Sequence, residues 1–309
     1  MRKLTAKRNK IVFRAIAAAV LLVFALLTFY ACSGGDKHPV TEAVILGDIE
    51  KLDNILKKGA DPNEIANGYP ALHRAFLEHA YKSTGIIELL ISHGADVNAR
   101  DGYGNSLMKH IICKNVKTYE QPEKIYIANI LLDNGYDVNE ADDNGTTLLM
   151  LASIDAKEIN IKASDYNLPF QLTELFLRYN ADLDAQDYMG RTALMWACAK
   201  KEWSAAGSGN DGLESPPIIR FEYKDRPAMR QILNYGLIKY LIEKGAYPLT
   251  TDANGYTPID YYNYAKMNFN MNSEVLESFN KIDELFDYYF EATSRQRDGK
   301  IEPNQKSLR

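Results

Sequence analysis

The sequence predicts an all-α solenoid of stacked helix–turn–helix units, joined by β-hairpin-like loops and closed by a C-terminal cap helix. One observation is a recurring segment that contains the apolar end of a helix, a turn and a new helix start. Its five copies occupy residues 55–70, 90–106, 131–147, 176–192 and 241–257. The other is composition: 46% of the 309 residues are hydrophobic and 25% are charged, which is typical of a folded protein.

Each copy has a glycine or an asparagine where its first helix ends, and a second glycine near the far end of the turn. The residue just past a helix C-terminus often has a left-handed backbone. Glycine adopts this conformation without steric cost, and asparagine tolerates it. We therefore expect positive φ at ten turn residues: Gly59, Gly94, Gly135, Asn180, Gly245, Gly68, Gly104, Gly145, Gly190 and Gly255.

The residues around the second glycine resemble a known repeat. Ankyrin repeats follow the pattern D-x-x-G-x-T-P-L-H-x-A, which is similar to "DGYGNSLM", "DDNGTTLLMLA", "DYMGRTALMWACA" and "DANGYTPID" in this chain. In that family a hairpin, a helix A, a short connection and a helix B make a unit of about 33 residues. The resemblance implies an ankyrin-repeat solenoid over residues 38–290, with units near 38–66, 67–100, 101–141, 142–186, 187–251 and 252–290.

Both ends of this array are expected to be helical. Pro39 stands where helix A of the first unit should begin, with Ala43 and Val44 on its packing face. The last helix A is predicted near 258–267. Beyond it, Ser273 can cap a longer helix with an apolar stripe formed by Val275, Phe279, Ile282, Phe286 and Tyr289. That helix would close the array, and the polar tail at 291–309 is expected to be disordered.

The units differ in length. Successive helix-ending residues are 35, 41, 45 and 65 positions apart, whereas the hairpin segments keep a nearly constant length. The extra residues should therefore lie between helix A and helix B, where the chain faces solvent. The longest insertion, 203–229, has a Gly/Ser-rich first half that should be mobile, and its "IIRFEY" should form a short strand or fold over the helices. A binding role and a tolerated excursion both remain open for it.

The N-terminus has the features of an export signal. Residues 1–31 hold six basic residues and no acid, and 15–31 are uncharged. Cys32 and the tether at 32–37 resemble the processing site of bacterial lipoproteins, in which the cysteine becomes the lipidated N-terminus. We expect a membrane-anchored protein of the bacterial cell envelope, periplasmic or surface-exposed. An uncleaved anchor helix and simple secretion are the alternatives, since seventeen apolar residues are also the lower limit for spanning a bilayer.

Charge limits the partners. Without residues 1–31 the number of Lys and Arg residues falls from 36 to 30 against 41 Asp and Glu, so the net charge becomes −11. A chain this acidic is a poor match for nucleic acid. It is also a poor match for an anionic membrane surface, so membrane attachment is expected only through the N-terminal lipid or anchor helix.

Other chemistry has weak support. The "GSGNDG" at 207–212 lacks the preceding strand and following helix of a dinucleotide site. The acidic turns, such as 137–145, lack the ligand spacing of a calcium loop and are attributed to hairpin hydrogen bonding. The five histidines show no paired metal spacing, and the resemblance gives His73 a structural role between loops. Cys113 and Cys198 lie two repeats apart, beyond disulfide reach. We therefore expect no cofactor, no metal and no catalytic group.

The repeated hairpins and A helices resemble the concave protein-binding surface of ankyrin proteins. Its variable positions, around each second glycine, are Tyr69, Arg100, Tyr103, Asn105, Tyr188, Met189, Arg191 and Tyr256. Aromatic residues and arginine commonly anchor interfaces, although these tyrosines could instead only cover neighbouring hairpins. The predicted function is a non-catalytic scaffold that binds another protein. A structural spacer or adhesin that contacts a host surface or polymer is the alternative, followed by an enzyme built on the insertions.

Overall fold

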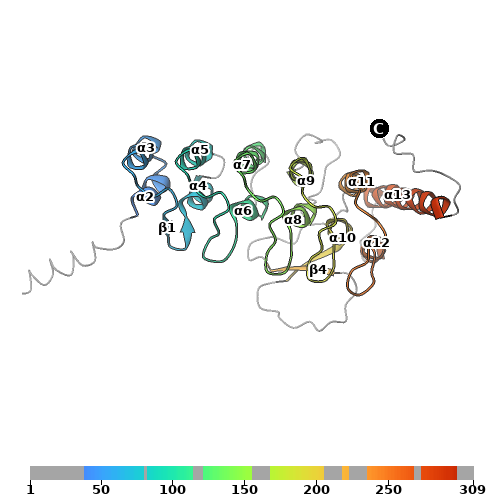
Figure 1. Cartoon of the computed structure of the whole chain (residues 1–309). Helices are drawn as coiled ribbons and strands as arrows, with labels where there is room; N and C mark the ends of the chain where they lie inside the picture. Colours follow the sequence, from blue (N-terminus) through green and yellow to red (C-terminus); the bar gives the residue numbers. More distant parts are fainter. Residues whose placement is uncertain are drawn as a thin grey trace, which may run out of the picture.

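The computed structural model describes residues 38–79, 82–113, 121–154, 168–204, 218–222, 235–267 and 273–297. Its helices form two parallel rows, with the hairpins projecting below one of them (Figure 1). The row next to the hairpins contains the A helices: α2 (Pro39–Leu46), α4 (Ala71–His79), α6 (Leu107–Cys113), α8 (Leu148–Ile154), α10 (Ala193–Cys198) and α12 (Pro258–Met267). The other row contains the B helices: α3 (Ile49–Lys57), α5 (Thr84–Ser92), α7 (Gln121–Asp133), α9 (Leu168–Arg178), α11 (Tyr235–Glu243) and α13 (Ser273–Arg297). The predicted all-α solenoid is confirmed.

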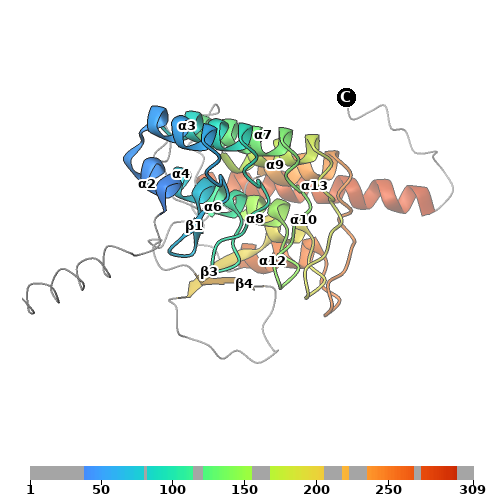
Figure 2. The same ribbon diagram turned by 60° about the vertical axis from the view of Figure 1, so that its left-hand side comes forward.

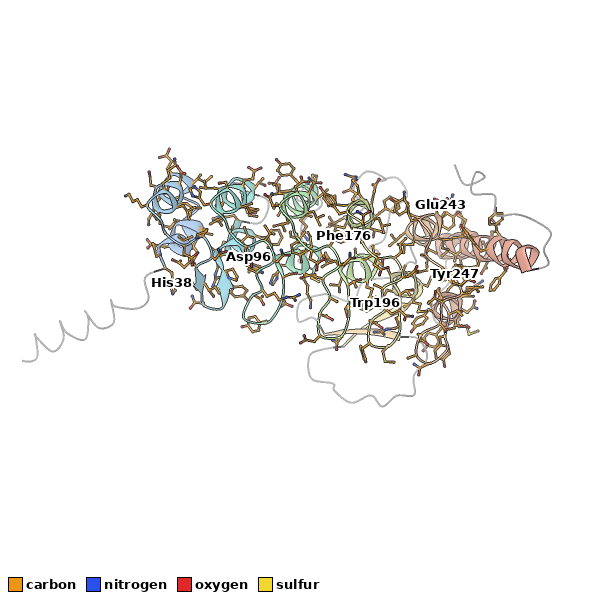
Figure 3. All side chains as sticks on the ribbon, in the orientation of Figure 1. His38, Asp96, Phe176, Trp196, Glu243 and Tyr247 are labelled. Carbon is orange, nitrogen blue, oxygen red and sulfur yellow. The ribbon has the colours of Figure 1, made fainter. Side chains whose placement is uncertain are left out.

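One hydrophobic core runs through the whole stack. It is a continuous cluster of buried side chains that reaches from Val40 in α2 to Phe286 in α13. Phe176 of α9 lies fully buried in its middle, between the two rows (Figure 3). Burying a phenylalanine side chain stabilises a fold by about 2–3 kcal/mol. Each unit therefore depends on its neighbours for most of its buried surface, as in other solenoids.

Hydroxyl side chains begin four of the A helices. Each accepts a hydrogen bond from the backbone N–H three residues later, which otherwise has no partner inside the helix. The donor–acceptor distances are 3.2, 3.3, 3.5 and 3.4 Å for Ser106, Thr147, Thr192 and Thr257. Pro258 then follows Thr257 as the first residue of α12. These four hydroxyl side chains thus mark where their helices start.

Left-handed residues end the B helices. The ten expected turn residues have φ between 63° and 112°. At Gly94 the backbone N–H donates to Ile91, and the N–H of Ala95 donates to Leu90 (3.0 Å). This paired arrangement satisfies carbonyl groups that the helix leaves free. Asn180, at φ 63°, ends α9 with the same bonds.

The longest insertion contributes a small parallel sheet. Strand β3 (Lys200–Ser204) pairs with β4 (Ile218–Glu222), from Lys200 opposite Ile218 to Ser204 opposite Glu222. Of the two alternatives for "IIRFEY", the structure has the short strand, which is β4 over Ile218–Glu222. Strand β3 was not predicted; it follows α10 because Ala199 is extended (ψ 146°) and not left-handed. The rest of 203–229, including 207–212, lies outside the described residues.

The first and last units close the stack. In α2, Ala43 and Val44 are buried as expected. At the other end α13 continues to Arg297 and extends past the stack (Figure 2). The prediction of disorder from residue 291 is therefore wrong for 291–297, because no glycine or proline interrupts the helix before Gly299. No helix within the described ranges is long and apolar enough to cross a bilayer. The expected anchor, 15–31, lies outside those ranges.

Candidate protein-binding face

In each of four hairpins, the side chain of one aspartate accepts hydrogen bonds from backbone N–H groups of the same hairpin. One carboxylate oxygen of Asp101 accepts hydrogen bonds from the N–H groups of Tyr103 (2.9 Å) and Asn105 (2.8 Å). The same pair of bonds recurs at three more aspartates: Asp142, Asp187 and Asp252. The acidic turns thus use their oxygens to hold the hairpin shape.

The second carboxylate oxygen ties three of these hairpins to helix A. This oxygen is hydrogen-bonded to the side chain nine positions later. The pairs are Asp101 with His110 (2.8 Å), Asp187 with Trp196 (3.0 Å) and Asp252 with Tyr261 (2.8 Å). Burial alone would raise the pKa of Asp101. Hydrogen bonds from Asn105, His110 and Tyr103 nevertheless lower the pKa overall, and the carboxylate stays charged. Hairpin and helix therefore form one rigid element.

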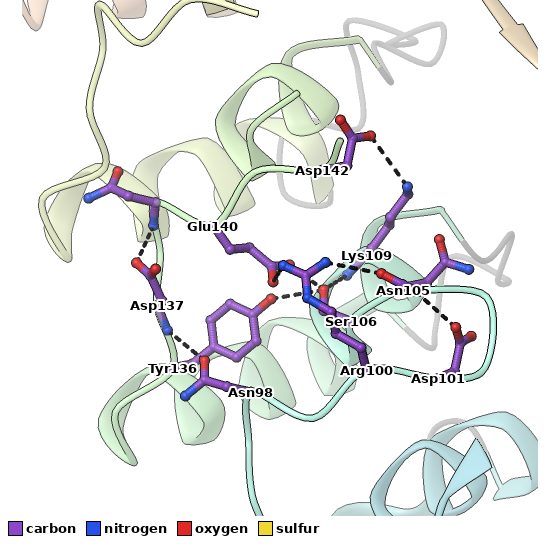
Figure 4. Close-up of polar contacts among 12 residues, drawn as sticks. Asn98, Arg100, Asp101, Asn105, Ser106, Lys109, Tyr136, Asp137, Glu140 and Asp142 are labelled. Atoms are coloured by element: carbon purple, nitrogen blue, oxygen red, sulfur yellow. Dashed lines mark hydrogen bonds and ion pairs between the residues drawn. The ribbon is translucent and has the colours of Figure 1, made fainter. Parts of the chain in front are cut away.

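Asparagine side chains join each hairpin to the next. The Asn98 side-chain amide donates to the carbonyl of Gly135 (3.2 Å), and its oxygen accepts from the N–H of Asp137 (3.0 Å; Figure 4). Asn63 and Asn139 make the equivalent pair of bonds in their own units. The next unit has Asp184 at this position, and a carboxylate cannot donate to a carbonyl. The asparagine ladder therefore stops before the joint that carries the longest insertion.

Two glutamates reinforce the joints by reaching back to an earlier helix. Glu64 accepts a hydrogen bond from the N–H of Thr41 (2.8 Å) at the start of α2, where the helix dipole favours an anion. Glu140 bonds to the Ser106 hydroxyl and to Arg100 (3.1 Å; Figure 4). The Tyr136 hydroxyl completes this group by donating to Ser106 (2.9 Å). Burial raises the pKa of Tyr136, so its hydroxyl remains a donor.

Tyr103 is the centre of a first exposed cluster on the hairpin tips. Its side chain is 76% exposed. Its ring lies 6.2 Å from that of Tyr69, which in turn carries the Arg74 guanidinium 4.8 Å from the ring centroid. The ring of His110 lies 6.5 Å from Tyr69. Two aromatic rings and an arginine, contributed by two adjacent units, thus form one patch.

A second exposed tyrosine, Tyr188, is 70% exposed. The N–H of Tyr188 donates to the carbonyl of Asn144 in the preceding hairpin (2.8 Å), which fixes the tip. Nearby, Arg191 donates to Asp187 (2.7 Å) and stacks over Trp196 with 5.3 Å to the ring centroid. The backbone of the exposed Tyr188 is therefore fixed by a hydrogen bond to the neighbouring hairpin.

Comparison with known proteins identifies the repeat. Residues 102–206 match the ankyrin repeats family over three copies, and residues 67–102 match a single ankyrin repeat. Residues 67–206 are therefore ankyrin repeats. The solved structure of EF0377, an ankyrin repeat protein, shares its fold with a TM-score of 0.52 and 20% identity, and covers 75% of this chain and 98% of that one.

Curated relatives match parts of the chain. It is 35% identical over 149 residues to human "Ankyrin repeat and SOCS box protein 6", which is 46% of this chain and 33% of that protein. It is 28% identical over 226 residues to "Palmitoyltransferase AKR1" of Lachancea kluyveri, which is 70% of this chain and 26% of that protein. The chain thus spans a third or less of the length of these relatives.

The structure divides the eight predicted binding residues into two groups. Tyr103, Tyr188, Tyr256 and Arg100 are exposed, whereas Tyr69, Asn105, Met189 and Arg191 are half-buried. Both arginines have partners within the ankyrin stack, since Arg100 also donates to the carbonyl of Gly104 (3.0 Å). Sequence reasoning missed Arg74, His110 and Trp196. The last two lie nine residues after a hairpin aspartate, and this spacing is the signal that could have found them.

His73 and Cys198 have interior positions in the ankyrin stack. The Nε2 of His73 lies 3.2 Å from the carbonyl oxygen of Asn105 and must carry a hydrogen, because a carbonyl only accepts. Its Nδ1 is buried without a partner. Burial and the nearby His110 lower the pKa of His73 to about 4, so the ring is neutral. Burial also raises the pKa of the Cys198 thiol, which keeps that group protonated and unreactive.

Proposed function

We propose that this ankyrin repeat protein is a non-catalytic scaffold in the bacterial cell envelope, and that its hairpin face binds another protein. The supporting observation is the pair of exposed tyrosines, Tyr103 and Tyr188, on hairpin tips whose backbone is held by interlocking hydrogen bonds. An aromatic side chain on a rigid support loses little entropy on binding. Such residues commonly supply much of the binding energy of an interface.

Attachment to the membrane is the second part of the proposal, and its support comes from the N-terminal sequence. A basic segment, an uncharged apolar run and Cys32 precede the stack, which begins at Pro39. Six residues lie between Cys32 and Pro39, and an extended chain spans at most about 3.6 Å per residue. A lipid on Cys32 would therefore hold the first ankyrin unit within roughly 25 Å of the membrane surface.

A capture experiment tests the binding role. The full chain is immobilised, and proteins bound from an envelope extract are compared for wild type and the double variant Tyr103→Ala, Tyr188→Ala. We expect the double variant to lose a specific partner because the two anchors are gone. Tyr288→Ala removes an exposed tyrosine from the cap helix and should keep it. Identical capture by all three proteins would refute the proposed face.

A labelling experiment tests the anchor. Cells that express the chain are fed radioactive palmitate, and the wild type is compared with Cys32→Ser. We expect label and membrane association only with Cys32 present. A labelled Cys32→Ser protein, or an unlabelled wild type with an intact N-terminus, would exclude lipidation at this residue.

A further inference from the structure

Four Asn–Gly pairs lie at turns in the part of the chain that the structure describes. They are Asn67–Gly68, Asn134–Gly135, Asn144–Gly145 and Asn254–Gly255. An asparagine followed by glycine can lose its side-chain amide without an enzyme, because glycine has no side chain to shield its backbone nitrogen. That nitrogen attacks the asparagine Cγ, and its N–H must first be free to lose the proton. The hydrogen bonds around each pair therefore decide which asparagine reacts.

In three of the pairs the glycine N–H is already a hydrogen-bond donor. Gly135 donates to the carbonyl of Leu132 (3.2 Å), Gly145 to that of Asp142 (2.8 Å) and Gly255 to that of Asp252 (3.0 Å). Each of these bonds must break before the nitrogen can attack. Only a locally opened turn can then react, and the closed turn is protected.

The asparagines of the same three pairs are also held. The side-chain amide of Asn134 donates to the carbonyl of Ile130 (2.8 Å). The backbone N–H groups of Asn144 and Asn254 donate to the aspartates of their hairpins, at 3.0 Å and 2.8 Å. These bonds resist the rotation that would bring the glycine nitrogen and the asparagine Cγ together.

The first hairpin is built differently. It consists of β1 (Ile65–Ala66; Figure 1) and β2 (Tyr69–Pro70), which are joined directly by Asn67 and Gly68. The φ angles of the two turn residues are 52° and 79°, and such a pair of positive values is typical of a two-residue type I′ turn. Among the described residues, the Gly68 N–H donates to no acceptor. This glycine nitrogen is therefore available for attack.

The first hairpin also lacks the carboxylate that fixes the later ones. Ile65 stands three residues before the turn glycine, where those hairpins have their aspartate. Pro70, which is paired with Ile65, has no N–H to donate across the two strands. The side chain of Asn67 is exposed. A bond from the Gly102 N–H to the Gly68 carbonyl (2.6 Å) fixes only the peptide group that follows the reacting one.

We propose that Asn67 is the preferred site of spontaneous deamidation among these four asparagines. The Gly68 nitrogen gives up its proton and forms a bond to the Asn67 Cγ, while the side-chain nitrogen leaves as ammonia. The product is a succinimide ring. Water then adds to one of the two ring carbonyls and breaks its bond to nitrogen, which leaves an aspartate or an isoaspartate at position 67. Water is the only co-reactant.

The reaction changes the first exposed cluster of the hairpin face. It adds a negative charge two positions before Tyr69, whose ring lies 6.2 Å from that of Tyr103 and has Arg74 4.8 Å from its centroid. The isoaspartate also lengthens the main chain of the turn, which disturbs the two-residue connection between β1 and β2. Aged protein would thus carry an altered surface at this joint, whether or not the face binds a partner.

Mass spectrometry of aged protein tests the proposal. The full chain is incubated in mildly alkaline buffer made with heavy-oxygen water, which labels every asparagine converted during the incubation. Fragment spectra then give the conversion at each Asn–Gly pair. We expect Asn67 to convert at least about fivefold faster than the others, which is the factor that one net hydrogen bond adds to a local closing equilibrium. In guanidinium chloride the turns are lost, and all four pairs should convert at similar rates.

Two variants give matched controls. Asn67→Gly keeps a residue that tolerates positive φ but has no amide, so the label in this turn should vanish while the other three pairs stay unchanged. Asp142→Ala removes the carboxylate that holds the N–H of Asn144 (3.0 Å), and conversion at Asn144 should rise several-fold. Circular dichroism and the urea midpoint of each variant show that it is folded.

Three results would overturn the proposal. The first is native protein in which Asn67 converts no faster than the other three asparagines. The second is an Asn67 that leads to the same extent in guanidinium chloride, since the local sequence and not the turn would then set the rate. The third is unchanged conversion at Asn144 in Asp142→Ala, which would show that the hairpin bonds do not control the reaction.

Discussion

Replacing Asn98 by alanine removes both hydrogen bonds that this side chain makes to the next ankyrin unit. The bonds join Asn98 to the carbonyl of Gly135 (3.2 Å) and to the N–H of Asp137 (3.0 Å). Both are solvent-exposed, so water can replace them in the variant. Each should contribute about 0.5–1 kcal/mol, at the lower end of the usual range. We therefore expect the free energy of unfolding to fall by about 1–2 kcal/mol.

The assay is urea unfolding of the full chain, followed by far-ultraviolet circular dichroism. A change in the midpoint without a change in slope reports a loss of stability alone. Asn98→Asp should lower the free energy of unfolding at least as much as Asn98→Ala, because it places a carboxylate oxygen next to the Gly135 carbonyl oxygen. The reciprocal variant is Asp184→Asn. It supplies a side-chain amide at the joint where the asparagine ladder stops, and it should raise the free energy of unfolding by about 1 kcal/mol.

Two outcomes would refute this reasoning. If Asn98→Ala unfolds at the wild-type midpoint, water replaces the side-chain bonds fully and the ladder contributes nothing. If Asp184→Asn gains no stability while Asn98→Ala loses it, the joint before the last unit is not built like the others. Backbone bonds between hairpins, such as that from Ala253 to Met189 (2.8 Å), would then hold that joint without help.

Three further predictions concern single residues. Gly190→Ala should destabilise more than Gly135→Ala in the same urea assay, because its Cβ would lie 2.8 Å from the nitrogen of Ala253, whereas Gly135 faces open space. The pKa of His73 drops from 6.5 to about 4 on folding. The contribution of the neutral His73 to the free energy of unfolding is therefore complete above pH 6.5 and is lost as the pH falls toward 4. Wild type should lose about 3 kcal/mol more than His73→Gln from pH 7 to 4. The Cys198 thiol should react with iodoacetamide only on unfolding, as mass spectrometry of the labelled peptide would show.

Much of the fold could be predicted because its signals are local. A glycine or asparagine at positive φ, such as Asn180, ends a helix whatever surrounds it, and a capping hydroxyl such as Thr257 begins one. The period of these signals gives the repeat. Strand β3 and the last turns of α13 were not predicted, because their sequences contain no such start or stop residues. Lys200–Ser204 becomes a strand only by pairing with residues 218–222.

The binding face was harder to predict than the fold. Exposed positions around the second glycines could be named, yet Arg191 is held by Asp187 and Trp196, and only Tyr103 and Tyr188 among the candidates are more than two-thirds exposed. Position along a hairpin does not reveal whether a side chain has a partner. A groove lined by residues of α7 and α9 was also missed, because these two helices are separated in the sequence by a whole helix A and hairpin.

By itself, the sequence determined where five of the B helices end, where the first and last A helices start, and how many residues separate one unit from the next, because backbone dihedral angles and end-capping act within a few residues. Only the tertiary structure decided which side chains have hydrogen-bond partners and which are exposed to solvent. Asn98 meets Gly135 across 37 positions, and Tyr126 meets Glu88 across 38. Contacts at that range depend on how neighbouring units stack, and stacking is a property of the packed core.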